Sequence, residues 1–286
     1  MTRDYDAILL DLDGTLVTDA GFVHPDTLAT LGAAQACGVR VMVATGRSEG
    51  GTIPVLAETG IATPAIVYNG AGVYCPVGRK LLEERVLSNR TIERTLAFAR
   101  AHDLLFIVMR FGEKFSMPPR TPEERRALEF LEDLHVVPPE QLPKESVMRL
   151  TLFSTRHDSP EALGASLEAA IDQPAYLTWF PLASLPHQRE NPLLVVDVQP
   201  PSRGKGEALR VIEETYGIPP ERVVAVGDAP NDVPMLERAG LAVAMANATS
   251  DVKAVAHRII GDNNGDAIGR LMDELFLGRD VVQDVG

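Results

Sequence analysis

The stretch Asp11-Leu12-Asp13-Gly14-Thr15-Leu16 carries two carboxylates two residues apart and directly follows the apolar run Ala7 to Leu10. The apolar run predicts a short buried strand, and the Asp-x-Asp-Gly sequence predicts that the chain turns where the strand ends. Taken alone, such a stretch more often marks an ordinary Asx or glycine turn than a catalytic site. Its meaning therefore depends on what else the chain contains.

The same alternation of apolar run and polar end recurs along the chain. Three later runs have this form: Val39–Ala44 before Thr45-Gly46-Arg47, Ala65–Tyr68 before Asn69-Gly70, and Val223–Val226 before Gly227-Asp228. Because helical segments separate these continuous apolar runs, we expect an α/β fold with a doubly wound parallel sheet. Further segments expected in this core are the helices Pro25–Ala36, Lys205–Tyr216, Val233–Ala239 and Asp266–Leu277 and the strands Leu241–Met245 and Arg258–Ile260.

The middle of the chain, residues 80–195, reads as a separate module of mixed α and β segments punctuated by prolines. Its expected strands are Leu105–Met109, Val147–Phe153, Tyr176–Phe180 and Leu193–Val198, and its expected helices are Thr91–Ala101, Glu123–Leu134 and Pro160–Ala170. The simplest organisation is a discontinuous core of residues 1–79 and 196–286, into which residues 80–195 are inserted as an α+β domain.

Composition and charge narrow the class of protein and its partners. The chain has 286 residues, 45% of them hydrophobic, and a formal net charge of −13, so it can bury a core without disulfides. The negative charge repels a phosphate backbone and an anionic membrane surface, so we expect neither nucleic acid nor membrane as partner. With two cysteines, no signal-peptide core and no run of membrane-spanning length, we expect a cytoplasmic protein with free thiols, a monomer or a homodimer.

Acidic side chains gather where the expected strands end. Ligands of a doubly wound sheet bind beyond the carboxyl ends of the strands, near the point where the strand order reverses. A cation would relieve the mutual repulsion of the four acids at these ends, which are Asp11, Asp13, Asp228 and Asp232. Oxygen ligands without neighbouring histidine or thiol are typical of Mg²⁺.

Together these segments resemble the haloacid dehalogenase superfamily of phosphohydrolases. Its motifs are matched in order by Asp11–Leu16, Ala44-Thr45-Gly46-Arg47, Gly204-Lys205-Gly206 and Gly227–Asp232, with the usual followers Asn69-Gly70-Ala71 and Met245–Ala248. The inserted module resembles, in size, position and composition, the type IIB α/β cap of the Cof-type subgroup. The resemblance covers nearly the whole chain.

The resemblance implies a role for each acid. Asp11 would attack the phosphorus and form an aspartyl-phosphate, and Asp13 would protonate the leaving alcohol and then activate water. The metal would be held by the carboxylates of Asp11 and Asp228 and by the main-chain carbonyl of Asp13. For Asp232 an outer role that stabilises the metal site is favoured over direct ligation.

The residues that the resemblance assigns to the substrate phosphate are Thr45, Gly46, Arg47, Asn69, Lys205 and Asn231. Several also have ordinary structural interpretations: Thr45 and Asn231 as caps, Arg47 and Lys205 as surface cations. The segment before Lys205 is richer in proline than the family pattern and adds Arg203 as a second candidate cation.

These observations favour a Mg²⁺-dependent phosphatase of small organic phosphate monoesters, with sugar phosphates as the first expectation. The resemblance also implies that dehalogenases and P-type pumps of this superfamily lack the second aspartate. The presence of Asp13 therefore argues against halide chemistry and against an ion pump. Two alternatives stay open: a phosphotransferase or phosphomutase on the same scaffold, and a non-catalytic phosphate-binding regulatory protein. The expected partner is a small phosphorylated metabolite.

Overall fold

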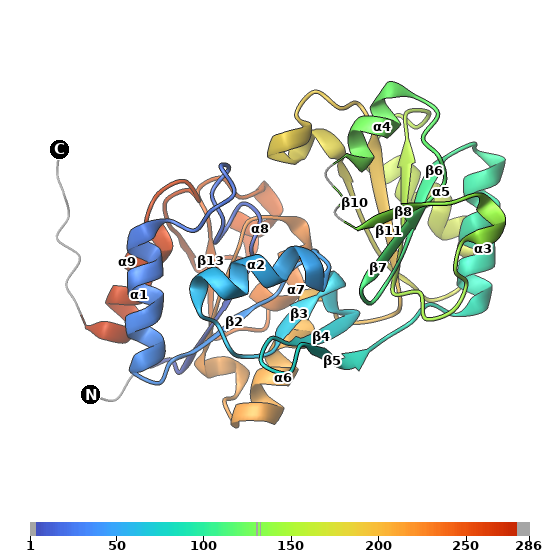
Figure 1. The fold of residues 1–286 in the computed structure, drawn as a ribbon. Helices are drawn as coiled ribbons and strands as arrows, with labels where there is room; N and C mark the ends of the chain where they lie inside the picture. The colour runs from blue at the N-terminus through green and yellow to red at the C-terminus, as the bar shows by residue number, and fades with distance from the viewer. Residues whose placement is uncertain (1–3, 130, 132, 279–286) are drawn as a thin grey trace. The chain divides into compact units, whose positions relative to one another are not determined.

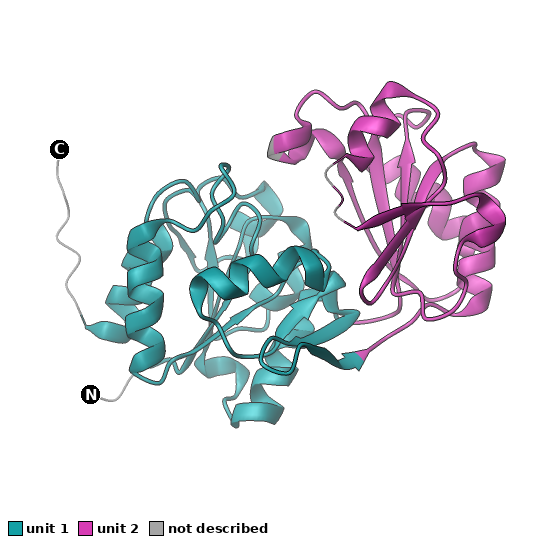
Figure 2. Cartoon of the chain, in the orientation of Figure 1, with its two compact units in different colours: residues 1–83, 203–286 teal, residues 84–202 magenta. Residues whose placement is uncertain are grey.

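The computed structural model of the chain describes residues 4–129, 131 and 133–278. Two compact units are formed by residues 1–83 with 203–286, called unit 1, and by residues 84–202, called unit 2 (Figure 2). Unit 2 begins four residues later and ends seven residues later than the inserted domain expected at 80–195. The later end reflects strand β11 (Leu194–Gln199), which pairs along its whole length with β10 (Tyr176–Pro181) of unit 2.

Unit 1 is built on a five-stranded parallel sheet in the order β14-β13-β12-β1-β2, of which β13 and β2 are labelled in Figure 1. Its strands are β1 (Ala7–Leu10), β2 (Arg40–Val43), β12 (Val223–Gly227), β13 (Leu241–Ala244) and β14 (Arg258–Ile259). The chain continues from β1 to β2 on one side and from β12 to β13 on the other, so the order reverses between β1 and β12. The expected doubly wound parallel sheet is confirmed.

Helices accompany this sheet, and α1 packs against α9 while α6 packs against α7. They are α1 (Pro25–Ala36), α2 (Glu49–Thr59), α6 (Glu207–Tyr216), α7 (Val233–Leu236), α8 (Ser250–Val255) and α9 (Ala267–Met272), which continues as a π-helical turn, Asp273–Leu277. The helix expected from Lys205 starts at Glu207 instead. Gly204–Gly206 form a separate 3₁₀ turn, η5, whose first glycine has a φ of +59°, so Lys205 lies in a turn before the helix.

The third expected strand does not belong to the parallel sheet in the way the sequence indicated. Strand β3 (Ala65–Val67) touches the sheet through one parallel bridge, Ala44 to Ile66, and pairs antiparallel with β4 (Gly72–Cys75). A 3₁₀ turn at Tyr68–Gly70, in which all three residues have positive φ, reverses the chain between them. With β5 (Lys80–Glu84) these strands form a small three-stranded sheet that the sequence did not predict.

Unit 2 contains a six-stranded sheet in the order β10-β11-β9-β6-β7-β8, antiparallel except for the pair β7 and β8. The remaining strands are β6 (Leu105–Arg110), β7 (Glu113–Ser116), β8 (Leu134–Val136) and β9 (Arg149–Ser154). Alternate strand residues such as Phe106, Leu152 and Val196 share an apolar core with α3 (Asn89–Ala101) and α5 (Pro160–Ile171). The expected α+β character of the insertion is confirmed.

One helix of unit 2 was predicted too long. The helix expected over Glu123–Leu134 is α4 (Pro122–Leu128), and Leu134 begins β8. Asp133 has a φ of +55°, a conformation that an α-helix cannot contain, so the chain turns there into the strand. Among the described helices, none combines the length and the apolar character that crossing a bilayer requires. No disulfide joins Cys37 and Cys75.

Candidate active site

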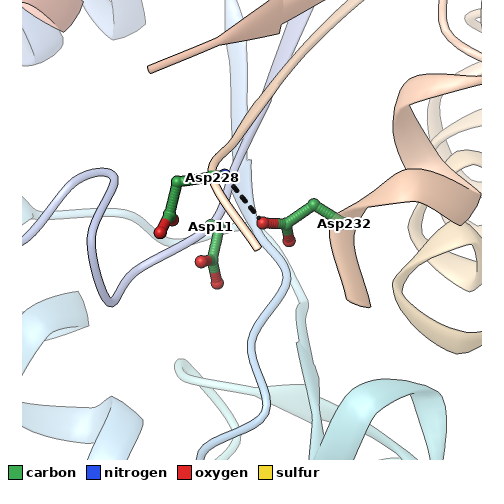
Figure 3. A group of neighbouring side chains, drawn as sticks. All are labelled: Asp11, Asp228 and Asp232. Carbon is green, nitrogen blue, oxygen red and sulfur yellow. Dashed lines mark hydrogen bonds between the residues drawn. The ribbon is translucent and has the colours of Figure 1, made fainter. Parts of the chain in front are cut away.

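Asp11 and Asp228 follow the two central strands of the unit 1 sheet, β1 and β12, at the point where the strand order reverses. The backbone N–H of Asp11 donates to the carbonyl of Val226 at 3.1 Å, so the pairing of the two strands continues past the end of β1. Carboxylate oxygens of Asp11, Asp228 and Asp232 lie within 4.8 Å of one another (Figure 3). The topology thus gathers acids from opposite ends of the chain.

Lys205 is the cation that faces these acids. Its Nζ donates to Asp11 Oδ1 and to Asp232 Oδ1, each at 2.6 Å, and the side chain is 1% exposed. Burial by itself lowers the pKa of Lys205, but the charges of the two aspartates and the hydrogen bonds to them outweigh burial and raise it. Lys205 is therefore a permanent cation. Arg203, the other candidate, is exposed.

Asp232 has both of its carboxylate oxygens occupied. Oδ1 accepts from Lys205, and Oδ2 accepts from the backbone N–H groups of Asp228 and Ala229, both at 2.9 Å. Figure 3 shows the contact between Asp228 and Asp232 as a dashed line. Asp232 is fully buried and fixes both the lysine and the turn that carries Asp228. This arrangement favours a supporting role over direct metal ligation.

The two other acids of the cluster retain protons more strongly than ordinary carboxyls. Burial raises the pKa of Asp11 well above its usual range, the charges of Asp232 and Asp228 add to this, and Lys205 opposes it. Burial, followed by the charge of Asp232, raises the pKa of Asp228 to about 6. A cation bound between Asp11 and Asp228 would oppose these shifts, and an all-oxygen donor set suits Mg²⁺. The residues present therefore fit this metal.

Asp13 points toward a different partner. Arg47 donates from Nε to Asp13 Oδ2 at 2.8 Å and from Nη2 to Oδ1 at 2.5 Å, while its Nη1 donates to the carbonyl of Gly51 at 3.0 Å. The Asp13 side chain is 52% exposed, unlike that of Asp11. Asp13 is thus accessible to a ligand, and its carboxylate is held by a fork of two parallel hydrogen bonds.

Four of the expected phosphate-binding residues, Thr45, Arg47, Asn69 and Asn231, form one hydrogen-bonded group. The hydroxyl of Thr45 accepts from the backbone N–H of Arg47 at 3.1 Å, and its carbonyl accepts from the N–H of Asn69 at 3.0 Å. Asn231 Nδ2 in turn donates to Asn69 Oδ1 at 3.0 Å. A Cβ on Gly46 would lie 3.2 Å from Asn69 Oδ1, so the asparagine amide packs directly on this glycine. All ten expected residues therefore meet at one edge of the unit 1 sheet.

The sequence did not predict the contacts that several other residues make at this edge of the sheet. Thr15 Oγ1 donates to Asp228 Oδ1 at 2.7 Å, and a Cβ on Gly14 would lie 2.3 Å from Asp228 Oδ2. Asn247 Nδ2 donates to the carbonyl of Gly14 at 2.8 Å, and the buried Asn263 donates to the carbonyl of Val17 at 3.0 Å. Thr15, Gly14 and Asn247 lie within segments that the sequence singled out, whereas Asn263 had no signal.

Comparison with known proteins places these features in a family context. The family described as haloacid dehalogenase-like hydrolase matches residues 8–272 of the chain. Pyridoxal phosphate phosphatase YbhA of Escherichia coli is 29% identical in an alignment 284 residues long that covers 93% of this chain and 96% of that protein. The 5-amino-6-(5-phospho-D-ribitylamino)uracil phosphatase YitU of Bacillus subtilis is 27% identical in an alignment 290 residues long that covers 96% of this chain and 98% of that protein.

Solved structures share the fold. A haloacid dehalogenase-like hydrolase from Bacteroides thetaiotaomicron has a TM-score of 0.77 at 24% identity and covers 95% of this chain and 100% of its own. A sugar phosphatase described as HAD subclass IIB has a TM-score of 0.77 at 22% identity, with 94% and 98% of the two chains covered. At 24% and 22% identity, the similarity of these two structures to this chain is a similarity of fold.

Proposed function

The chain belongs to the haloacid dehalogenase-like hydrolase family, and on this premise we propose that it is a Mg²⁺-dependent phosphatase of small organic phosphate monoesters that works through an aspartyl-phosphate on Asp11. The observation that carries the proposal is the environment of Asp11. This carboxylate is 3% exposed, ends a strand at the switch point of the sheet, and has one oxygen bound by the buried ammonium of Lys205.

Phosphoryl transfer asks a protein mainly for positioning and for neutralisation of charge. Lys205 serves the second need, because it partly cancels the negative charge of Asp11 that would otherwise repel an incoming phosphate. An oxygen of the Asp11 carboxylate would then attack phosphorus. The P–O bond to the alcohol breaks as the bond to Asp11 forms, and water later hydrolyses the aspartyl-phosphate to regenerate the carboxylate.

Mg²⁺ would be held by the carboxylates of Asp11 and Asp228 and by the main-chain carbonyl of Asp13. When bound, it would bring positive charge to the phosphate oxygens and to the carboxylate cluster. Thr15 orients Asp228 through its hydroxyl, and Asp232 fixes the backbone of Asp228 through two N–H groups. These contacts hold one ligand of the site in place whether or not a metal is bound.

Asp13 is the group suited to move protons. As an acid it would protonate the leaving oxygen, and as a base it would take a proton from the attacking water. Its exposed position near Arg47 supports this role, since the group must reach both the ester and water. Thr45, Gly46, Asn69 and Asn231 are the proposed donors to the phosphate.

The substrate is proposed to be a small phosphorylated metabolite, with sugar phosphates tested first. The relatives named for pyridoxal phosphate and for a phosphorylated ribitylaminouracil, and the neighbour named a sugar phosphatase, support this size and class. The net charge of −13 makes nucleic acid and an anionic membrane poor partners. The proposed location is the cytoplasm, and the proposed oligomeric state is a monomer or a homodimer.

The test is release of inorganic phosphate from sugar phosphates, pyridoxal phosphate, nucleotides and p-nitrophenyl phosphate, with Mg²⁺ and with EDTA. We expect metal-dependent release that Asp11→Asn abolishes and that Asp26→Asn, an exposed carboxylate in the first turn of α1, leaves unchanged. No release from any substrate would contradict the proposal. Transfer of the phosphoryl group to an added sugar instead of water would identify a phosphotransferase.

A further inference from the structure

We propose that Arg47 is a positioning residue for Asp13: its guanidinium holds the Asp13 carboxyl in the orientation that proton transfer requires, and it does not bind the substrate phosphate directly. The inference rests on the proposed function, because it concerns the residue that would move protons there. It replaces the phosphate-binding role that the sequence suggested for Arg47.

The contact between the two side chains is a bidentate fork. Nε and Nη2 of Arg47 donate to the two oxygens of Asp13 at 2.8 Å and 2.5 Å. Such parallel charge-assisted hydrogen bonds fix the direction of a carboxylate as well as its distance. Asp13 follows β1 and Arg47 follows β2, so the pair joins the ends of two neighbouring strands.

Arg47 is itself anchored on both sides of this fork. Its backbone N–H donates to Thr45 Oγ1 at 3.1 Å, and its Nη1 donates to the carbonyl of Gly51 in the first turn of α2 at 3.0 Å. The arginine stem also packs on this turn, because a Cβ on Gly51 would lie in ordinary van der Waals contact, 3.5 Å, with Arg47 Cβ. A side chain held at its backbone and at its far end can impose its geometry on a partner.

Asp13 needs this support. Its side chain is 52% exposed, so packing alone does not select one rotamer, whereas Asp11 and Asp232 are buried and held by Lys205. An acid that delivers a proton must keep its oxygen within hydrogen-bond reach of the leaving group, and a misplacement of 1 Å can cost about 10²-fold in rate.

The alternative is that the guanidinium of Arg47 binds the substrate phosphate, for which it would need the nitrogens that now hold Asp13. Asp13 accepts from Nε and Nη2 of Arg47, the edge that offers two parallel N–H groups, and Gly51 accepts from Nη1. A phosphate bound at Nε and Nη2 would compete with Asp13 for them. Loss of a phosphate ligand weakens binding of substrate and of inorganic phosphate, whereas loss of a positioning contact slows the step that needs the proton and leaves binding nearly unchanged.

The experiment compares wild type, Arg47→Ala, Arg47→Lys, Asp13→Asn and the Arg47→Ala/Asp13→Asn double variant with Mg²⁺. Phenyl phosphate and p-nitrophenyl phosphate are the substrates, because phenol is the weaker acid and its departure needs the proton more. We expect Arg47→Ala to slow release of phenol about 10- to 100-fold and release of p-nitrophenol less. KM and inhibition by inorganic phosphate should change less than about twofold.

Two further outcomes are specific to positioning. Arg47→Lys keeps the charge but cannot form the fork, so it should remain impaired. In the Asp13→Asn background, Arg47→Ala should add little further loss, because the two residues act as one unit. Arg258→Ala is the matched control, since Arg258 makes an equally bidentate pair with Glu274, both bonds 2.7 Å, on the edge strand β14. It should leave the kinetics unchanged.

The proposal would be overturned if the rate losses of Arg47→Ala and Asp13→Asn were fully independent in the double variant. A large rise in the inhibition constant of inorganic phosphate at unchanged kcat would also overturn it. Crystal structures of wild type and Arg47→Ala separate this failure from failure of the proposed function. We expect one Asp13 rotamer in wild type and several in the variant, whether or not any ester is hydrolysed. A single unchanged Asp13 rotamer in Arg47→Ala would refute the positioning role even in an inactive protein.

Discussion

At the scale of single residues, the site is a balance between acids that repel one another and the lysine that holds two of them. Asp11, Asp228 and Asp232 share a small volume, and Lys205 donates to Asp11 and Asp232. A buried ion pair of this kind adds little net stability as a whole, but removing one partner leaves the other uncompensated. Single substitutions in this group should therefore change both the free energy of unfolding and the protonation of the remaining acids.

The first prediction concerns the lysine. Lys205→Met keeps most of the buried stem but removes the charge, and we expect the free energy of unfolding to fall by about 3–5 kcal/mol near neutral pH. The loss should shrink in acid, where Asp11 takes up a proton and needs no partner. Urea unfolding measures it, with Lys80→Met on the exposed edge of β5 as the control. A loss below about 1 kcal/mol would mean that the pair behaves like a surface salt bridge.

The second prediction follows from the raised pKa of Asp228, about 6 in the folded protein. An unfolded aspartate titrates near about 3.9, so the folded state binds the proton more tightly. The resulting stabilisation is complete below the unfolded pKa and is lost as pH rises through about 6.

Without metal, we therefore expect Asp228→Asn to be more stable than wild type at about pH 8, by up to about 3 kcal/mol, with the difference vanishing toward about pH 4. Added Mg²⁺ should stabilise wild type more than the variant, because only wild type offers both carboxylates. Urea unfolding in EDTA and in Mg²⁺ across this pH range is the measurement. Equal stability of the two proteins in EDTA at every pH would contradict the account.

At the scale of elements, the loop after β1 has to approach Asp228 closely. Gly14 has a φ of +77° and its Cα faces the Asp228 carboxylate, while Thr15 donates to that carboxylate. Gly21, in the same loop, has a φ of +88° with open space around it. The two glycines therefore share a backbone conformation that an L side chain resists, but only Gly14 touches an acid of the site.

This pair gives the third prediction. Gly14→Ala and Gly21→Ala should each lose about 1–2 kcal/mol of stability, because both place a Cβ at positive φ. Gly14→Ala should in addition reduce phosphatase activity by about 10²-fold or more, because its Cβ would displace Asp228. Parallel measurement of thermal unfolding and kcat/KM checks both effects. Equal activity of the two variants would show that the close approach at Gly14 has no catalytic consequence.

The sequence predicted most strands of the parallel sheet well because β1, β12 and β13 are continuous apolar runs whose residues are almost all buried. It failed where a local backbone conformation decides the path. The positive φ of Tyr68 and Asn69 turns the chain from β3 back into β4, and the positive φ of Asp133 turns it into β8 where a longer helix was expected. Apolar periodicity carries no information about such turns, and none of these three residues is a glycine.

At the scale of the whole molecule, unit 2 is one continuous segment with its own apolar core. Buried residues from Leu87 to Val198 form that core within residues 84–202. As the fourth prediction, we expect residues 84–202 expressed alone to unfold in a single cooperative transition by circular dichroism and to lack phosphatase activity. A chain that shows no cooperative unfolding would mean that unit 2 depends on unit 1 to fold.

The candidate site was predictable because parallel strands deliver their carboxyl ends to one edge of the sheet. That rule and the order of the motifs are enough to group Asp11, Asp228 and Lys205 from the amino-acid sequence alone. They could not identify Asn263, whose amide supports the β1 loop from the far end of the chain. Contacts between amide side chains and distant carbonyls leave no pattern in a single sequence.

Asp11 is the residue that we propose to carry the phosphoryl group. Denaturing mass spectrometry of the enzyme quenched in acid during turnover of p-nitrophenyl phosphate with Mg²⁺ tests it most directly. We predict one added phosphoryl group, located on the peptide that contains Asp11 and absent from Asp11→Asn. Turnover with the phosphoryl group on another residue, or full turnover by Asp11→Asn, would contradict the account.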